Sequence, residues 1–214
     1  MQCGLTLTRL DADAAHPDST FVEDTAVLVP RCAVLMRPGA PSRAGEVTTI
    51  STALRERFPQ LHEIGAPGTV DGGDICEAGN LVIIGISHRT NDEGARQLAA
   101  LLATAGYATC FVDIRGIPGI LHLKSGVTWL GDGRLLVIDE LAEHEAFRAF
   151  ERVIVAPDDA YAANAVRVND RVLVADGFPR VHETLARYGY SPLVLEMSEF
   201  RKMDGGLSCL SLRY

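Results

Sequence analysis

The stretch AGNLVIIGISHRTNDEGARQLAALLATAGYATCFVDI, residues 78–114, contains the pattern that decides the fold. It opens with the turn signal Gly79-Asn80, continues into the short apolar run Leu81–Ile86, and ends in a second apolar run, Cys110–Ile114. Between the two runs, Asn91–Gly106 carries an apolar stripe at helical spacing, with an N-cap predicted at its first residue and a C-cap at its last. The stretch predicts a strand, a helix and a strand after a tight turn.

The same pattern extends outward in both directions along the chain. Further turns are predicted at Gly131–Gly133 and Asn169–Asp170, and Gly189 is a further predicted C-cap. The other predicted helices are Arg43–Phe58, Glu140–Phe150 and Pro179–Tyr188. The other predicted strands are Phe21–Val29, Ala33–Met36, Val127–Leu130, Leu135–Ile138, Val153–Val155, Ala165–Val168, Val172–Ala175 and Leu193–Leu195. A unit of strand pair, helix and strand recurring roughly every forty to fifty residues predicts an α/β or mixed α+β fold.

Composition and charge narrow the class of protein. The chain has 214 residues, 47% of them hydrophobic, which predicts a single domain with a substantial core. Its 20 basic and 28 acidic residues include no basic run, so a nucleic-acid partner is not expected. Neither a G-x-G-x-x-G pattern after a strand nor a Walker-type loop occurs, which disfavours a plain Rossmann fold and nucleotide chemistry.

Cysteine spacing and hydropathy indicate the cellular compartment of the protein. The five cysteines are odd in number and lack C-x-x-C spacing, which favours a reducing cytoplasm and gives a structural zinc site little support. Residues 1–10 do not resemble a signal peptide. No apolar run approaches the about 20 residues that a membrane-spanning helix needs. We therefore predict a cytoplasmic protein with no membrane partner, no metal and no cofactor.

Two acidic clusters follow or precede apolar runs, where side chains can converge on a cleft. The segment His16–Asp24 places Asp18, Glu23 and Asp24 around Phe21. Such acids are ordinarily part of a solvated turn, but buried paired carboxylates match the planar fork of a guanidinium. The second cluster, Asp71-Gly72-Gly73-Asp74, is a reasonable turn sequence whose glycines permit backbone geometry closed to other residues.

Two further clusters contain a histidine and a cysteine. His122 lies between aliphatic residues at the start of a predicted strand, where a histidine is more often a satisfied core residue than a catalyst. Cys209 follows Gly205-Gly206 in the segment that begins at Met203. A lone cysteine is more often an inert core thiol, but a glycine turn before it lets a substrate approach the sulfur. The other four cysteines lack such surroundings.

Taken together, these segments resemble the dimethylarginine dimethylaminohydrolases, within the larger guanidino-group-modifying superfamily that includes the arginine deiminases. The similar stretches run through nearly the whole chain and are specific as a set, although each is ordinary alone. They are Pro17–Asp24, Arg37–Arg43, Ala66–Asp74, Arg89–Gln97, Leu121–Gly126, Tyr161–Asn164 and Phe200–Leu212.

The resemblance implies a pentein-type α/β propeller of ββαβ modules with pseudo-fivefold symmetry. It also implies a role for individual residues. Cys209 matches the family nucleophile, His122 the general acid/base, and Asp71 the acid that orients the histidine. The implied substrate-binding residues are Asp18 near the α-amino group, Asp24 on the guanidinium with Phe21 and Glu23 beside it, Arg43 and Arg89 on the α-carboxylate, and Met203.

The implied reaction is hydrolysis of a guanidinium C–N bond in methylated arginine, giving citrulline and dimethylamine through a thiouronium on Cys209. A thiolate suits this reaction because the delocalised guanidinium carbon is a poor electrophile. The arginine deiminases resemble a pattern with an acid two residues after the histidine, whereas that position is Lys124 here. The difference favours an alkylated substrate. Arginine deiminase activity and a non-catalytic propeller that acts as a binding protein are the two alternatives.

The chain differs from the family pattern at its beginning. Family chains usually begin with a further strand and helix before the segment that matches residues 1–24, so we predict one catalytic domain over residues 1–214 with an incomplete first module. A late start of the reading frame and a genuine short form both explain this difference. The resemblance is also compatible with a homodimer.

Overall fold

The computed structural model describes residues 3–214, which form two compact units. One unit comprises Lys124–Ser208 together with the N-terminal residues up to Ala12, and the other comprises Asp13–Leu123 and Cys209–Tyr214. The prediction of one catalytic domain over the whole chain stays a prediction.

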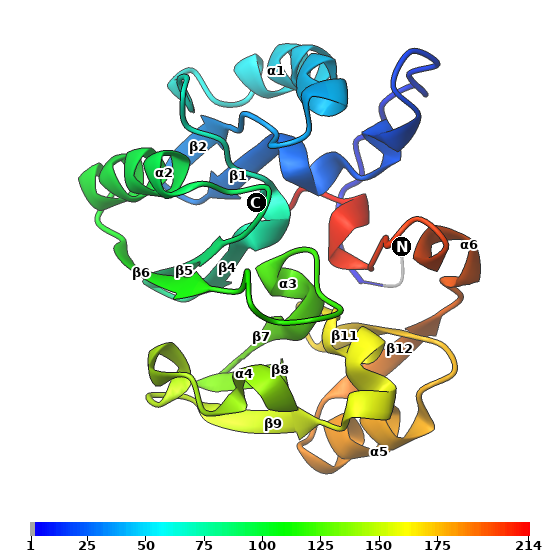
Figure 1. The fold of residues 1–214 in the computed structure, drawn as a ribbon. Helices are drawn as coiled ribbons and strands as arrows, with labels where there is room; N and C mark the ends of the chain where they lie inside the picture. Colours follow the sequence, from blue (N-terminus) through cyan, green and yellow to red (C-terminus); the bar gives the residue numbers. More distant parts are fainter. Residues whose placement is uncertain (1–2) are drawn as a thin grey trace. The chain divides into compact units, whose positions relative to one another are not determined.

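The unit of residues 13–123 and 209–214 contains two modules with the same order of elements (Figure 1). In the first, strand β1 (Ala26–Val29) pairs antiparallel with β2 (Cys32–Leu35), helix α1 (Val47–Arg55) follows, and β3 (Leu61–Glu63) pairs parallel with β2. The second repeats this order with β4 (Ile75–Ala78), β5 (Leu81–Ile86), α2 (Asp92–Thr104) and β6 (Ala108–Asp113).

The other unit contains two more modules of this kind. One consists of β7 (Val127–Gly131), β8 (Arg134–Ile138), α4 (Asp139–Ala142) and β9 (Glu151–Val155). The next consists of β10 (Val166–Val168), β11 (Arg171–Ala175), α5 (Pro179–Arg187) and β12 (Ser191–Leu195). In each, the first two strands are antiparallel and the third is parallel to the second. The predicted repeat of strand pair, helix and strand is confirmed.

Shorter helices connect these elements. The two short α-helices are α3 (Leu123–Gly126) and α6 (Ser198–Arg201). The 3-10 helices are η1 (Pro17–Thr20), η2 (Val22–Thr25), η3 (Pro41–Glu46), η4 (Gly72–Asp74), η5 (Glu145–Phe147), η6 (Pro157–Ala163) and η7 (Ser208–Leu210).

Several local predictions are confirmed by hydrogen bonds. The side chain of Asn91 accepts a hydrogen bond from the N–H of Gly94, as an N-cap does. Gly106 and Gly189 follow the ends of α2 and α5 with φ of +83° and +86°, a backbone conformation that glycine adopts without strain. All three predicted turns join antiparallel strands.

Other predictions were wrong in extent. The strand predicted at Phe21–Val29 begins only at residue 26, because residues 22–25 form η2, in which the Thr25 hydroxyl donates to the Val22 carbonyl. The helix predicted at Arg43–Phe58 is η3 followed by α1. The helix predicted at Glu140–Phe150 ends at residue 142, and the extended His144 then caps η5. Strands β3 and β4 were missed, because both are short and carry charged residues.

Strands β1 and β2 are buried on both faces, which explains why they read as continuous apolar runs. Ala26 and Leu28 of β1 pack with Ile50 and Leu54 of α1. The alternate residues of β1 and β2 pack instead in a larger cluster with strands β4 and β5 and with helix α2. Within the described residues, no helix combines the length and the apolar character needed to span a membrane.

Candidate active site

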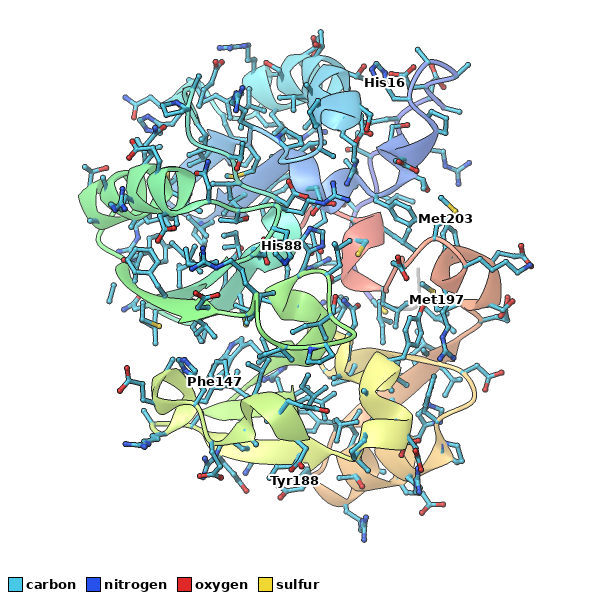
Figure 2. The ribbon with its side chains drawn as sticks, in the orientation of Figure 1. His16, His88, Phe147, Tyr188, Met197 and Met203 are labelled. Carbon is cyan, nitrogen blue, oxygen red and sulfur yellow. The ribbon has the colours of Figure 1, made fainter. Side chains whose placement is uncertain are left out.

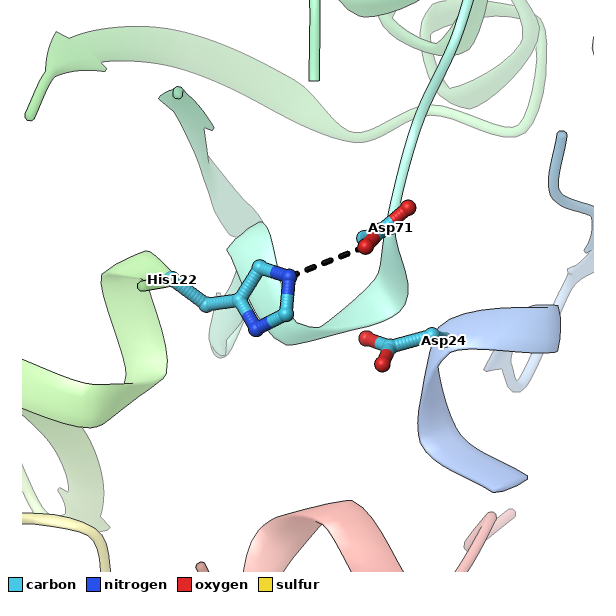
Figure 3. Close-up of side chains that lie close together, drawn as sticks. All are labelled: Asp24, Asp71 and His122. Atoms are coloured by element: carbon cyan, nitrogen blue, oxygen red, sulfur yellow. Dashed lines mark hydrogen bonds and ion pairs between the residues drawn. The ribbon is translucent and has the colours of Figure 1, made fainter. Parts of the chain in front are cut away.

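A histidine and an aspartate lie at hydrogen-bonding distance in the unit of residues 13–123 and 209–214. His122 Nε2 is 3.0 Å from Asp71 Oδ2, and both residues are buried (Figure 3). His122 directly precedes helix α3, so its prediction at the start of a strand was wrong: the strand β7 begins five residues later. Asp71 directly precedes η4, and its Oδ1 accepts the N–H of Gly39 at 2.7 Å. The aspartate is therefore held by backbone on one side and faces the imidazole on the other.

The two glycines of the Asp-Gly-Gly-Asp segment are needed for space. A Cβ on Gly73 would lie 2.7 Å from Nδ1 of His122, and one on Gly72 would lie 2.0 Å from the carbonyl oxygen of Glu23. Neither glycine has a positive φ, so the sequence argument from special backbone geometry was wrong for this pair. Glycine is required here because other segments approach the η4 backbone closely.

A second carboxylate lies beside the pair. Asp24 is buried, and its Oδ1 accepts the N–H of Gly73 at 2.9 Å. One ligand atom from each of Asp24, Asp71 and His122 can be chosen so that all three atoms lie within 4.8 Å of one another. Burial alone would raise the pKa of Asp24, but the charges of His122 and Arg43 and the hydrogen bond from Gly73 outweigh it and lower that pKa.

Arg43 is bound to Asp24. Its Nη1 donates to Asp24 Oδ2 at 2.5 Å, its Nη2 donates to the carbonyl of Phe21 at 2.9 Å, and its Nε and Nη2 donate to the carboxylate of Glu46. Burial lowers the pKa of Arg43, but these two carboxylates raise it above its ordinary value. The buried Arg43 thus bridges the ends of η2 and η3.

The carboxylates change the protonation state of His122. Burial by itself lowers the pKa of this imidazole, because it disfavours the charged form. The negative charges of Asp24, Asp74 and Asp71, and the hydrogen bond to Asp71, outweigh burial and raise the pKa to about 9. His122 is therefore a cation at neutral pH, with Nε2–H donating to Asp71 and Nδ1 turned away from it (Figure 3).

The other predicted site residues are less tightly grouped. Phe21 and Glu23 are buried, and Glu23 lies 3.8 Å from Arg213 Nη2. Asp18 is half-buried, and its carbonyl accepts from Arg43 at 3.3 Å. Arg89 is half-buried in the loop after β5. Met203, labelled in Figure 2, is 63% exposed and belongs to the other unit, as does Lys124.

Cys209 is a half-buried, reduced thiol in η7 and belongs to the same unit as His122 and Asp71. Residues 205–208, which lead to it, are buried in the other unit. The roles predicted for Cys209 and for the substrate-binding residues stay predictions.

Sequence reasoning missed several polar residues around the site. Glu46 falls within the predicted helix Arg43–Phe58 and was given no role, although it is buried against Arg43. Ser87 and Thr90 are buried beside the Asp-Gly-Gly-Asp segment, and their hydroxyls were not singled out. The only sequence signal for them was their place directly after an apolar strand, where polar side chains often meet.

The histidine and the two aspartates also have ligand types that a metal ion could use. Metal binding would have to displace a proton from His122, whose pKa the neighbouring carboxylates raise to about 9. Its Nε2 is moreover occupied by Asp71. These groups fit acid/base chemistry better than metal binding, and the absence of a metal stays a prediction.

Comparison with known proteins gives the family. The arginine deiminase family model matches residues 16–171. The chain is 41% identical to the dimethylarginine dimethylaminohydrolase of Pseudomonas aeruginosa, over 99% of this chain and 83% of that protein. A solved dimethylarginine dimethylaminohydrolase, in an adduct with S-methyl-L-thiocitrulline, matches with a TM-score of 0.95, 41% identity and coverage of 99% and 83% of the two chains. The P. aeruginosa enzyme, as a cysteine-to-serine mutant complexed with citrulline, matches with a TM-score of 0.91, 41% identity and coverage of 94% and 78%.

These matches confirm the pentein-type α/β fold class and define the chain as a guanidino-group-modifying protein of the arginine deiminase family. Within that group, the chain belongs to the dimethylarginine dimethylaminohydrolase family.

Proposed function

We propose that this hydrolase converts dimethylarginine and water to citrulline and dimethylamine, with Cys209 as nucleophile, His122 as acid and base, and Asp71 as the group that orients His122. The observation that carries the proposal is the buried His122–Asp71 pair beside Asp24, in the unit that also contains Cys209. The relative complexed with citrulline supports the same product.

Asp24 has the capacity to bind a guanidinium. A carboxylate offers about four lone-pair positions, and the two bonds from Arg43 and Gly73 use two of them. The lowered pKa of Asp24 keeps it ionised, as recognition of a cation requires. The remaining positions can accept N–H donors of the substrate in the orientation that a planar fork demands. Arg89 and Arg43 would hold the α-carboxylate, with Asp18 near the α-amino group.

The reaction proceeds in two halves. The thiolate of Cys209 adds to the guanidinium carbon, protonated His122 donates its proton to the departing dimethylamine, and the C–N bond breaks to leave a thiouronium. Neutral His122 then takes a proton from water, the resulting hydroxide adds to the same carbon, and the C–S bond breaks to restore the thiolate. The proton of the added hydroxyl group passes to the released dimethylamine in solution, which leaves neutral citrulline. A histidine with a raised pKa suits the first half. The cationic substrate on Asp24 offsets one of the charges that raise that pKa, which assists the second half.

The test is a citrulline assay with dimethylarginine, monomethylarginine and arginine, with Cys209→Ser as the inactive control. We expect citrulline from the methylated substrates and none from the variant. Citrulline and ammonia from arginine as the main reaction would establish the arginine deiminase alternative. Absence of citrulline from all three substrates would favour the binding-protein alternative and contradict the proposal.

We also propose that the enzyme is cytoplasmic and forms a homodimer. The five reduced cysteines are compatible with a reducing compartment. Light scattering coupled to size-exclusion chromatography tests the dimer, and a mass near the 23.0 kDa of one chain would contradict it.

A further inference from the structure

Asp74, the second acid of the Asp-Gly-Gly-Asp segment, is fully buried and accepts three hydrogen bonds from three different positions. Its Oδ1 accepts the N–H of Leu123 at 2.9 Å, and its Oδ2 accepts the hydroxyls of Ser87 at 2.7 Å and Thr90 at 2.6 Å. A buried carboxylate is costly unless its oxygens are satisfied, and here both are.

The hydroxyl of Ser87 can only donate to Asp74. A hydroxyl has one hydrogen to donate and two lone pairs. Both lone pairs of Ser87 Oγ are used, by the N–H groups of Arg89 at 2.9 Å and Thr90 at 3.0 Å. Ser87 must therefore donate its hydrogen to Oδ2, and the Leu123 N–H donates to Oδ1, so Asp74 accepts at these two contacts. Burial raises the pKa of Asp74, whereas the charge of His122 and the hydrogen bonds from Thr90, Ser87 and Leu123 favour its ionised form.

Each partner of Asp74 is adjacent to a residue of the proposed site. Leu123 is bonded to His122 in the chain, so the Leu123 N–H contact fixes the backbone that carries the imidazole. Thr90 Oγ1 accepts the N–H of Asp71 at 3.1 Å, which fixes the acid that faces the imidazole. Ser87 holds the N–H of Arg89. One carboxylate thus connects the three segments that bring these groups together.

Space for this network is kept by a glycine in strand β5. A Cβ on Gly85 would lie 2.8 Å from the Leu123 side chain and 2.9 Å from Asp74 Oδ1. The Leu123 segment can therefore approach the carboxylate only because position 85 carries no side chain.

We propose that Asp74 is a positioning residue for hydrolysis, which holds His122 and Asp71 in their mutual geometry by binding Leu123 N–H and, through Thr90, Asp71 N–H. The kinetic part of this proposal rests on the proposed function. The geometric part does not, because the titration of His122 can be followed without substrate.

Replacement of Asp74 has an electrostatic consequence as well as a geometric one. Three carboxylates, Asp24, Asp71 and Asp74, act on His122 and raise its pKa, against the effect of burial. An asparagine at position 74 removes one of these charges and places an amide NH2 either against the Leu123 N–H or against the Ser87 and Thr90 hydroxyls, so one of the native contacts is mismatched in either orientation. The pKa of His122 should therefore fall in Asp74→Asn.

The experiment compares Asp74→Asn with the unchanged protein in steady-state kinetics over pH and in an NMR titration of the His122 ring. We expect kcat with dimethylarginine to fall by about a hundredfold with KM changed by no more than about threefold, as for loss of a transition-state geometry. The alkaline limb of kcat/KM and the NMR pKa of His122 should both move to lower pH by roughly one unit. Asp159→Asn, which removes a buried carboxylate bound to Arg180 in the other unit, is the matched control and should leave both unchanged.

A folded Asp74→Asn protein with an unchanged kcat and an unchanged His122 titration overturns the proposal. If that variant does not fold, Thr90→Val and Thr90→Ser decide, because both keep the charge of Asp74 and only serine keeps the hydroxyl. Thr90→Ser should retain kcat and Thr90→Val should lose about tenfold, whereas equal kcat values would overturn the positioning role. If the unchanged protein produces no citrulline, the proposed function fails, and the NMR titration still tests Asp74.

Discussion

Each unit contains a buried polar side chain that ties several segments of the chain together, and these two side chains differ in charge. In the unit of residues 13–123 and 209–214 this is Asp74, a carboxylate that accepts from Ser87, Thr90 and Leu123. In the other unit it is Asn164, whose Nδ2 donates to the Lys124 carbonyl at 2.9 Å and to Ser208 Oγ at 3.1 Å, and whose Oδ1 accepts the Ser208 N–H at 2.9 Å. Both are buried, and both have a glycine packed against them, Gly85 and Gly206 respectively.

The difference in charge matches the residue that each one supports. Asp74 binds the residue that follows His122, where a negative charge favours the imidazolium that we propose as the proton donor. Asn164 binds the residue that precedes Cys209, where a negative charge would oppose the thiolate that we propose as the nucleophile. A neutral amide satisfies a carbonyl and an N–H together without adding charge. Geometry is therefore fixed in both places, and charge is added in only one.

The largest expected loss of kcat follows a substitution among the carboxylates around His122. Asp71→Asn keeps the size of the side chain but removes the carboxylate that faces His122 Nε2. An amide can present its N–H to the ring and favour the wrong tautomer, so we expect kcat to fall by about a thousandfold or more. Steady-state kinetics with dimethylarginine measure this. A loss below about tenfold would show that Asp71 does not orient the acid/base.

A substitution of the neutral Asn164 should reduce kcat less and should also lower the free energy of unfolding. Asn164→Leu leaves the Ser208 N–H and the Lys124 carbonyl without their partner, which we expect to destabilise the fold by about 2–3 kcal/mol. We expect kcat to fall by about thirtyfold, because the segment before Cys209 loses its support. Urea unfolding and kinetics measure the two effects. Unlike Asp74→Asn, this variant should not shift the alkaline limb of the pH profile of kcat/KM. A shifted limb would contradict the view that Asn164 supports geometry without affecting charge.

The pH dependence of the unchanged protein sharpens the charged half of the comparison. The pKa of His122 is raised from 6.5 to about 9, so its contribution to stability is complete below about pH 6.5 and is lost as the pH rises through about 9. Proton donation to the leaving amine is lost over the same upper range. We expect kcat/KM to fall about fivefold between pH 9 and pH 10, and the free energy of unfolding to decline from pH 7 to pH 10. An alkaline limb centred near pH 6.5 would show that the carboxylates do not control His122.

The smallest expected effect lies outside both networks. Asn91→Ala removes the N-cap of α2 and should lower the free energy of unfolding by about 1 kcal/mol. It should leave kcat and the pH profile unchanged, because the Asn91 side chain bonds to Thr69, Gly94 and Pro67 rather than to a residue of the proposed site. Thermal unfolding and kinetics test this, and a large loss of kcat would extend the functional network to the start of α2.

The sequence predicted most of the architecture because turn residues and apolar periodicity are local signals. The Gly79-Asn80 turn and the helix that follows Asn91 needed no knowledge of distant residues. Strand β3 could not be found in this way, because its three residues are half-exposed or exposed and owe their conformation to pairing with β2.

The residues of the candidate site likewise divide into those that the sequence predicted and those that only the structure reveals. The site's histidine and two of its acids were found from a resemblance that covers nearly the whole chain, but Glu46 has no local signal and Thr90 has only its place after an apolar strand. Glu46 follows Arg43 by three residues, which on a surface helix would be an ordinary exposed ion pair. Only the three-dimensional structure reveals that the pair is buried against Asp24. Long-range contacts of buried polar groups are therefore what the sequence alone could not supply.

The missing side chain at Gly73 has a consequence for how this protein tolerates change. A methyl group there would overlap the imidazole of His122, so the ring fits only because residue 73 has no Cβ atom. In a complete mutational scan, position 73 should accept no other amino acid while activity is selected, although glycine itself has no reactive group.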